Sequence, residues 1–95
     1  MNDDQMQIEH RETELHGEFT IGRDAIMTYR KVEDGLIEVN HTRVAEEARG
    51  RGLAAVLYRA MVRHARSQDL KVRTTCSYVA RMFERFPADR DLLAD

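Results

Sequence analysis

The segment HTRVAEEARGRGLAAVLYRA, residues 41–60, combines charge and backbone freedom in a way that suits the binding of an anion. Arg49 and Arg51 alternate with Gly50 and Gly52 immediately before a segment with helical periodicity. Neighbouring arginines repel one another and glycine weakens a helix, so a negatively charged partner would offset both costs. The arginines offer charge-assisted hydrogen bonds, and the glycines allow positive φ and close approach of the backbone. The unpaired first-turn amides and the helix dipole favour an anion at the same place.

The spacing of these glycines differs from the best-known phosphate-binding loops. It matches neither G-x-x-x-x-G-K-(S/T) nor the dinucleotide pattern G-x-G-x-x-G, which argues against a P-loop or a Rossmann fold. A glycine turn with a purely structural role is the alternative to an anion site.

Charge is distributed unevenly along a chain whose net charge is only −2. Residues 1–42 hold ten acidic and four basic side chains, whereas residues 43–85 hold ten basic and four acidic ones. Residues 86–95 are again acidic, with three acidic residues and Arg90. The central segment therefore predicts a local positive field that attracts a phosphate-bearing partner, with an ordinary solvated surface as the alternative.

The length and composition are typical of a small globular domain. The 95 residues form one domain, residues 1–95, with a modest core. No apolar run reaches the length of a membrane span, and the first ten residues are too acidic and polar for a secretory signal. The single cysteine, Cys76, has no internal disulfide partner, which fits a reducing, cytoplasmic setting.

Hydrophobic periodicity predicts the elements that must position these residues. Turn signals at Ile21–Asp24 and Glu33–Gly35 separate β-patterned runs and indicate antiparallel hairpins. A helix, a short strand and a second helix follow, so one right-handed β-α-β crossover with parallel strands is expected. The predicted fold class is α+β, a small mixed and mainly antiparallel sheet with two helices. The predicted strands are Met6–Thr13 at the edge, His16–Ile21, Ala25–Val32, Leu36–Val44 and Lys71–Cys76, and the predicted helices are Gly52–Ser67 and Tyr78–Phe86.

The same patterns predict which side chains share a face. Period-two alternation divides the strand Leu36–Val44 between two faces. One face carries Ile37, Val39 and His41, and the other carries Leu36, Glu38, Asn40, Thr42 and Val44. Helical spacing gives two apolar stripes, one of Leu53, Leu57, Ala60, Met61 and Ala65 and one of Val79, Met82, Phe83 and Phe86. Ser77 is the expected N-cap of the second helix, and Pro87 is its stop.

Three motifs of this chain resemble the GNAT superfamily of N-acetyltransferases. The segment from His41 to Arg66 resembles motif A, whose signature is Q/R-x-x-G-x-G/A. More closely, the chain is similar to a small, minimal GNAT-like subfamily with an H-T-x-V strand end, an R-G-x-G-(I/L)-(A/G) turn and a C-x-(F/Y)-V run. These motifs correspond to His41–Val44, Arg49–Ala54 and Cys76–Val79, in the same order and with matching spacing. The resemblance extends from Phe19 to about Leu93, most of the chain.

The resemblance implies a binding site for acetyl-coenzyme A. In the family, the turn and the helix start hold the pyrophosphate, and the pantetheine arm lies beside the preceding strand, where the parallel neighbour separates from it. Carried over, backbone groups of Thr42 and Val44 would bind pantetheine. The pyrophosphate would be held by the turn and the first helical residues, namely Arg49, Gly50, Arg51, Gly52, Leu53 and Ala54. The thioester would then point toward the gap between His41 and Cys76.

The chain departs from the superfamily pattern in three ways. Glu47 stands at the Q/R position, three residues before Gly50, and Arg49 and Arg51 would compensate for its charge. Phe83 occupies the place where many members carry a tyrosine as general acid toward the coenzyme A thiolate. The chain also has no room for the N-terminal helices that shape the acceptor pocket in standard members.

Cys76 and His41 are the candidate catalytic residues. Cys76 lies just before the N-terminus of a predicted helix, whose dipole favours a thiolate, and His41 lies near the end of the adjacent parallel strand. A Cys–His pair would let the thiolate attack the thioester and pass the acetyl group to an acceptor. In direct transfer, the alternative, His41 removes a proton from the acceptor amine. A buried small cysteine and a structural strand histidine are the other interpretations, and Tyr78 is expected to pack rather than react.

The sequence thus predicts an acetyl-CoA-dependent N-acetyltransferase whose acceptor, a small amine or a protein, it does not identify. A non-catalytic acyl-CoA-binding or sensing module is the alternative, favoured by Phe83 and the missing acceptor elements. A nucleic-acid-binding domain ranks third, because aromatics are sparse in the basic stretch and the net charge is negative. The spacing of His, Cys, Asp and Glu predicts no metal site, and His10, His16 and His64 receive no role. A monomer or weak dimer without a membrane partner is expected.

Overall fold

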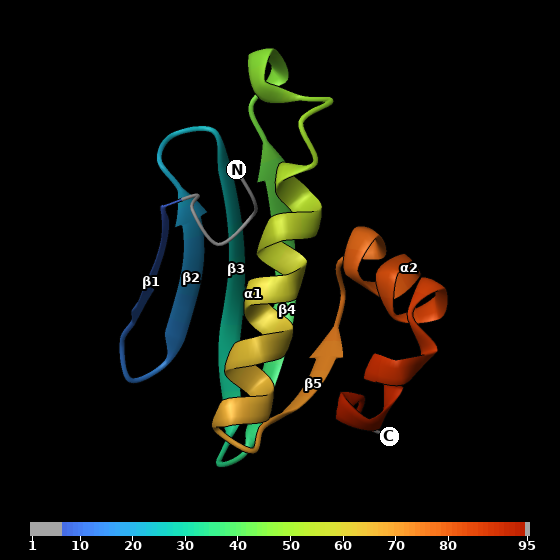
Figure 1. The fold of residues 1–95 in the computed structure, drawn as a ribbon. Coiled ribbons are helices and arrows are strands. Elements are labelled where there is room, and N and C mark those ends of the chain that lie inside the picture. Colours follow the sequence, from blue (N-terminus) through green and yellow to red (C-terminus); the bar gives the residue numbers. More distant parts are fainter. Residues whose placement is uncertain (1–6, 95) are drawn as a thin grey trace.

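Five strands in the order β1-β2-β3-β4-β5 form the sheet around which the chain is organised (Figure 1). This computed structural model describes residues 7–94. The strands are β1 (Ile8–Glu12), β2 (His16–Ile21), β3 (Ala25–Glu33), β4 (Leu36–Val44) and β5 (Lys71–Thr74). The helices are α1 (Leu53–Ser67) and α2 (Ser77–Arg85), with the short 3-10 helices η2 (Glu46–Ala48) and η3 (Pro87–Leu92).

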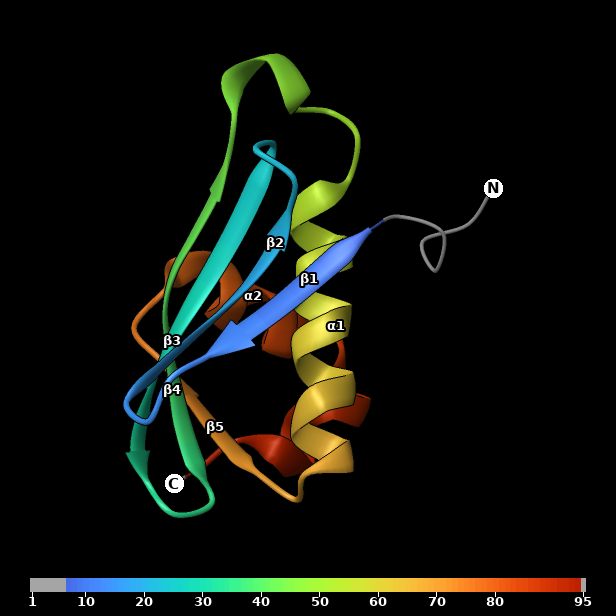
Figure 2. The same ribbon diagram turned by 90° about the vertical axis from the view of Figure 1, so that its left-hand side faces the viewer.

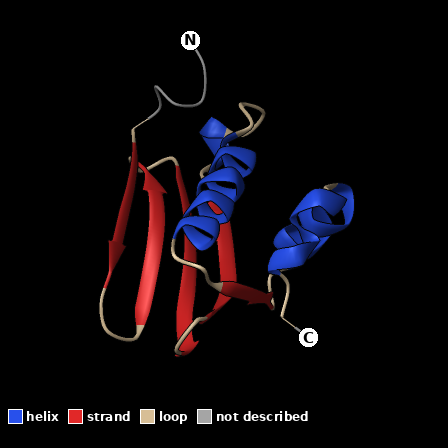
Figure 3. Cartoon of the chain, turned by 60° about the horizontal axis from the view of Figure 1, so that its bottom comes forward, coloured by secondary structure: helices blue, strands red, loops and turns tan. Residues whose placement is uncertain are grey.

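The sheet is antiparallel from β1 to β4 and parallel between β4 and β5. Short turns join the antiparallel neighbours, whereas α1 carries the chain from β4 to β5 and so permits parallel pairing. α1 lies along one face of the sheet (Figure 2), and α2 follows β5 and lies beside α1 (Figure 3). The predicted α+β class, with a mixed sheet and one crossover, is confirmed. The predicted edge strand is present as β1, and Met6, its predicted first residue, lies outside the described residues.

The core forms where inward side chains of the sheet meet the apolar face of α1. Met27 and Val39 from the sheet and Leu57 and Met61 from the helix are all 0% exposed. Strand alternation and the helical repeat bring these apolar groups to one interface, where their removal from water stabilises the fold. The interface fixes α1 against β3 and β4, the two strands that lead into the candidate site.

The buried face of α1 is wider than the predicted stripe. All five stripe residues are buried, and so are Val56, Tyr58 and Val62. The additional burial arises because α1 also contacts the C-terminal elements: the Tyr58 ring meets Phe83 of α2 edge-on, with 5.5 Å between centroids. Neither helix of the described chain has the length and hydropathy that a membrane crossing requires.

A β-bulge in β4 breaks the predicted alternation of side chains. Val39 pairs with Tyr29 and His41 pairs with Thr28, so Asn40 has no partner of its own on β3. At this point two residues of β4 oppose one residue of β3, and the alternation shifts by one residue.

Beyond the bulge, the side chains of β4 therefore exchange faces. Thr42 pairs with the buried Met27 and, because cross-strand partners share a face, lies on the α1 side together with Val39. His41 lies on the opposite face and is exposed. Asn40 lies on its predicted face, where its side chain accepts a hydrogen bond from Thr28 Oγ1. The predicted faces are wrong from His41 onward, since strict period two does not anticipate an inserted residue.

The turn before α2 also differs from the prediction. Ser77 is the predicted N-cap, but Cys76 holds that position and no side chain caps the helix. The hydroxyl of Thr74 accepts a hydrogen bond from the Cys76 amide at 2.9 Å. This bond fixes the turn so that α2 begins one residue earlier than predicted. At its other end α2 stops at Arg85, and Phe86 is 41% exposed instead of completing the buried stripe.

Candidate functional site

The loop between β4 and α1 contains the glycines of the predicted anion site. Gly50 and Gly52 have φ angles of 87° and 75°, a left-handed conformation that glycine adopts without a steric penalty. A Cβ added at either position would meet no atom within 4 Å, so both residues border open space. The glycines therefore form the turn and at the same time leave its surface accessible.

The first turn of α1 presents backbone amides without intrahelical acceptors. Gly52 is the N-cap, and its carbonyl accepts a hydrogen bond from the Val56 amide at 3.2 Å. The amides of Leu53, Ala54 and Ala55 precede this bond, and no side chain caps the helix start. Together with the helix dipole, these amides create an electropositive surface.

This surface borders a hollow of about 270 Å³. Its lining comes from the end of β4, the loop and the first turns of α1 and α2, namely Val44, Ala48, Arg49, Gly50, Gly52, Leu53, Ala54, Ala55 and Tyr78. Six of the eight residues predicted to bind the cofactor line this hollow, whereas Thr42 and Arg51 do not. Larger hollows of about 400 and 530 Å³ lie near β1, but none of the first-turn amides of α1 borders them.

The two loop arginines take different directions. Arg49 Nε donates a hydrogen bond to the Val44 carbonyl at 3.4 Å, so its side chain stays beside the end of β4. Arg51 Nη1 lies 3.4 Å from Asp24 Oδ2, in the turn between β2 and β3. The Asp24 carbonyl also accepts a hydrogen bond from the Ala45 amide at 2.8 Å, so this turn contacts both ends of the loop. The ion pair is exposed and therefore restrains Arg51 only weakly.

Tyr78, for which the sequence predicts only packing, forms one wall of the hollow. Burial raises the pKa of its phenol, and Arg59, Arg85 and Arg81 oppose that shift electrostatically. Three arginines of α1 and α2 are therefore near enough to act electrostatically on this phenol. The C-x-(F/Y)-V motif contains Tyr78, but no local spacing connects it to the glycine loop.

β4 and β5 separate at the bulge. Val39 pairs with Thr74, and the Thr75 amide donates a hydrogen bond to the Val39 carbonyl at 3.0 Å. Beyond Val39, β4 pairs only with β3, as far as Val44. Within residues 7–94, the edge of residues 40–44 that faces β5 is thus left without a strand partner. This edge leads from the thiol of Cys76 to the glycine loop.

Cys76 is half-buried at the separation of the strands, and its thiol contacts Thr42. The Sγ–H group donates to Thr42 Oγ1 at 3.5 Å. His41 does not join this pair, because the bulge turns it to the other face, and among the described residues it makes no side-chain hydrogen bond or ion pair. The structure therefore places Thr42, and not His41, beside the thiol. The catalytic roles of Cys76 and His41 stay predictions.

Phe83 packs in the core and has no proton to donate as a general acid. Its side chain is 2% exposed and lies in the core against Tyr58. The Tyr58 hydroxyl donates to Asp89 Oδ2 at 2.8 Å, and burial raises the pKa of this phenol well above its ordinary value. Neither aromatic ring lines the hollow beside the glycine loop.

Comparison with known proteins identifies similar sequences over most of the chain. The family model for GCN5-related N-acetyl-transferases matches residues 12–92. Protein NATD1 from Gallus gallus and Protein NATD1 from Homo sapiens are each 32% identical over 63 residues, which is 66% of this chain. The match covers 57% and 56% of those proteins, so the chain spans little more than half the length of these curated relatives.

A solved structure agrees in fold and in sequence. The NMR solution structure of a GCN5-like protein from Staphylococcus aureus matches with a TM-score of 0.70 and 34% sequence identity. The match covers 90% of this chain and 87% of the other. The arrangement of the sheet and helices described above is therefore shared with that protein.

The left-handed conformation of the glycine loop predicts the effect of a side chain there. Gly52→Ala should lower the free energy of unfolding by about 1–2 kcal/mol, because an L-residue is strained at positive φ. Gly52→Asn should cost less, since asparagine tolerates this conformation better than alanine. Urea denaturation followed by circular dichroism measures both variants. Equal stability of the alanine variant and the parent chain would contradict the assigned conformation.

Proposed function

Because the chain belongs to the GCN5-related N-acetyltransferase family, we propose that it binds acetyl-CoA at the start of α1 and transfers the acetyl group to an acceptor. The hollow beside the glycine loop carries this proposal, since first-turn amides, left-handed glycines and Arg49 meet there. A pyrophosphate has several oxygen acceptors and negative charge, which such a surface complements.

Several residues around the hollow would each contribute to binding the phosphates. The amides of Gly52, Leu53 and Ala54 would donate to pyrophosphate oxygens, and Arg49 would add charge from the β4 side. Arg51 would leave its exposed partner Asp24 to reach the ligand, at little cost. These contributions would outweigh the nearby charge of Glu47, which replaces the superfamily's usual Q/R residue.

The unpaired edge of β4 would bind the pantetheine arm. The two amides of pantetheine can form hydrogen bonds with this edge in place of the missing part of β5. Backbone groups of Thr42 and Val44 are the proposed partners, since both lie beyond the last pair between β4 and β5. A ligand anchored at the glycine loop and extended along this edge would bring its thioester toward Cys76.

Cys76 is the proposed first acceptor of the acetyl group. Its sulfur would attack the thioester carbonyl carbon, forming a new C–S bond while the C–S bond to coenzyme A breaks. The thiol proton passes to the departing sulfur, which leaves as the free thiol of coenzyme A. An amine nitrogen would then take the acetyl group, returning one proton to the cysteine sulfur. Thr42 Oγ1, which accepts the thiol hydrogen bond, would orient the sulfur.

Direct acetyl transfer and a non-catalytic acyl-CoA-binding module are the alternatives to the covalent route. In direct transfer, His41 would act as base, and the acceptor amine would then have to approach from the face opposite Thr42. The non-catalytic acyl-CoA-binding module has one specific observation in its favour: Phe83, in the place of a general acid, is a core residue.

A negative charge introduced at the start of α1 should weaken ligand binding without lowering the stability of the fold. Ala54→Glu should weaken acetyl-CoA binding at least about tenfold, because the carboxylate repels the pyrophosphate. The same charge is favourable for the helix dipole, so the free energy of unfolding should not fall. Isothermal calorimetry measures the affinity, with Ala88→Glu on the exposed part of η3 as the matched control. Equal affinity of both variants would place the ligand elsewhere.

The covalent route predicts an acetylated intermediate at Cys76. Intact-mass spectra of the chain mixed with acetyl-CoA should show the mass of one added acetyl group. Cys76→Ser should abolish this adduct, whereas His41→Gln should form it at the parent rate, because His41 does not contact the thiol. The urea-unfolded chain gives the rate of unassisted thiol acetylation. Saturable binding without an adduct, and no turnover over a panel of amines, would instead select the non-catalytic module.

A further inference from the structure

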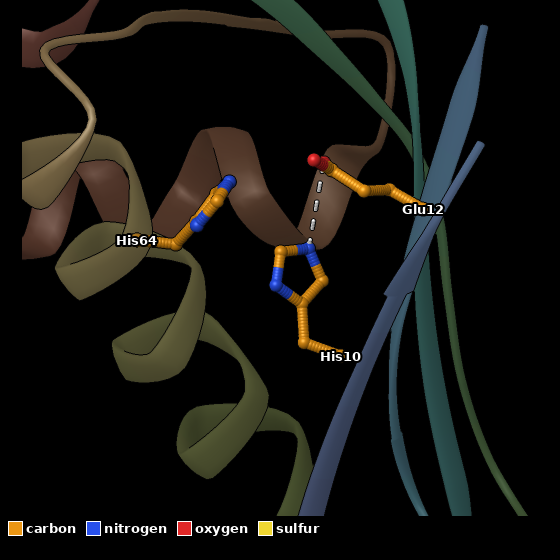
Figure 4. Close-up of side chains that lie close together, drawn as sticks. All are labelled: His10, Glu12 and His64. Atoms are coloured by element: carbon orange, nitrogen blue, oxygen red, sulfur yellow. Dashed lines mark ion pairs between the residues drawn. The ribbon is translucent and has the colours of Figure 1, made fainter. Parts of the chain in front are cut away.

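Two histidines and a glutamate meet between β1 and the C-terminal half of α1. His10 and Glu12 lie on β1, and His64 projects from α1 toward them (Figure 4). One ligand atom from each residue lies within 4.8 Å of the other two. His64 is eleven residues beyond Leu53, about 16 Å along the helix axis. The cluster is therefore remote from the amides that are proposed to bind acetyl-CoA.

Strand pairing explains why these β1 residues face the helix. Glu12 pairs with Gly17, and Gly17 pairs with Tyr29. Tyr29 is buried on the face of the sheet covered by α1, so Glu12 projects to the same side. His10, two residues earlier on the strand, shares this face.

Gly17 allows the Tyr29 ring to cross β2 and reach the cluster. A Cβ at Gly17 would collide with the Tyr29 ring, so a larger residue does not fit without displacing it. The Tyr29 hydroxyl donates to Glu12 Oε2 at 2.7 Å, and His10 Nε2 lies 2.6 Å from the same phenol oxygen. The phenol thereby holds the carboxylate and the imidazole in a fixed relative orientation.

Aromatic contacts hold the two imidazoles against each other. His10 stacks on Phe19 with 4.2 Å between centroids, and His64 meets His10 edge-on at 4.3 Å. Burial lowers the pKa of both His10 and His64. A neutral imidazole keeps one nitrogen lone pair available to a metal.

We propose that His10, Glu12 and His64 bind a divalent transition metal of the zinc type, which fastens β1 to α1. Two imidazoles and one carboxylate form a donor set that zinc accepts, with a fourth position for water. A hollow of about 400 Å³ that borders Glu12 and His64 gives water and metal access. β1 is an edge strand with mostly exposed residues, so a metal bond to α1 would add substantially to its attachment.

Metal binding requires a small contraction of the cluster. Zinc bonds of about 2.0–2.2 Å set tetrahedral ligands about 3.4 Å apart, so the three side chains must approach one another by roughly 1 Å. His10 Nε2, which lies 3.9 Å from Glu12 Oε2, exchanges its contact with Tyr29 for the metal. Tyr29 continues to donate a hydrogen bond to the Glu12 carboxylate and so orients this ligand without binding the metal itself.

Lys31 opposes the metal and thereby offers a test of the site. Its Nζ lies 3.3 Å from Glu12 Oε1, on the carboxylate that would bind the cation. The lysine charge repels a divalent ion, so removing it strengthens metal binding. A variant that gains affinity cannot be explained by loss of the fold.

Cobalt and zinc titrations of the full, tag-free chain test the proposal. One equivalent of Co²⁺ should bind with the visible absorption of a tetrahedral site, and Zn²⁺ should raise the melting temperature. His64→Gln and Glu12→Gln should weaken the affinity for Co²⁺ at least about tenfold and reduce the rise in melting temperature with Zn²⁺. Lys31→Gln should tighten metal binding several-fold. Circular dichroism of each metal-free variant checks that the fold is retained.

Three control variants remove the other imidazole donors and the thiol of the chain. His16→Gln, His41→Gln and Cys76→Ser should leave the cobalt spectrum and the affinity unchanged. Absence of a one-to-one complex in the folded parent chain, or an equal loss in the controls, would overturn the site and leave a metal-free hydrogen-bond cluster. Zinc should not change acetyl-CoA affinity, so the failure of this proposal is distinguishable from failure of the proposed function.

Discussion

The inserted residue in β4 is the constraint on which the candidate acetyl-CoA site depends. Asn40 has no partner of its own on β3, and the last pair between β4 and β5 lies immediately before it. The extra residue bends the strand and exchanges its faces, which turns Thr42 toward the thiol of Cys76. A hydrogen bond from Thr28 Oγ1 to Asn40 Oδ1, at 2.5 Å, supports the bulge. With regular alternation, Thr42 would face away from α1.

α1 connects two chemically different regions through a rigid core. Its first turn presents amides beside the glycine loop, and its last turns carry His64 toward β1. Between them, Leu57 and Met61 are fully buried against the sheet, which fixes both ends of the helix relative to the strands. The proposed phosphate site and the proposed metal site thus share one scaffold but have no side chain in common.

Local patterns predict the elements of this fold well, because periodicity and turn chemistry act over a few residues. The five-residue stripe of α1 and the strand bounds of β2 and β4 are confirmed on this basis. The faces beyond Asn40 could not be predicted, since a bulge depends on the partner strand. From the sequence, Tyr78 is expected only to pack and His64 receives no role, because contacts between distant elements bring both residues to their places. The proposal of acetyl-CoA as the ligand rests on the resemblance of the Arg49–Ala54 turn to a known motif.

Acetyl-CoA is proposed to bind at the start of α1 and along the free edge of β4. Amide nitrogen–proton NMR spectra of the full chain, recorded during titration with acetyl-CoA, test this residue by residue. Saturable shifts are expected for Gly50, Gly52, Leu53 and Ala54 and for residues 40–44, with the amides of β1 unchanged. The absence of saturable shifts, or shifts confined to β1 and the surroundings of His64, would contradict it.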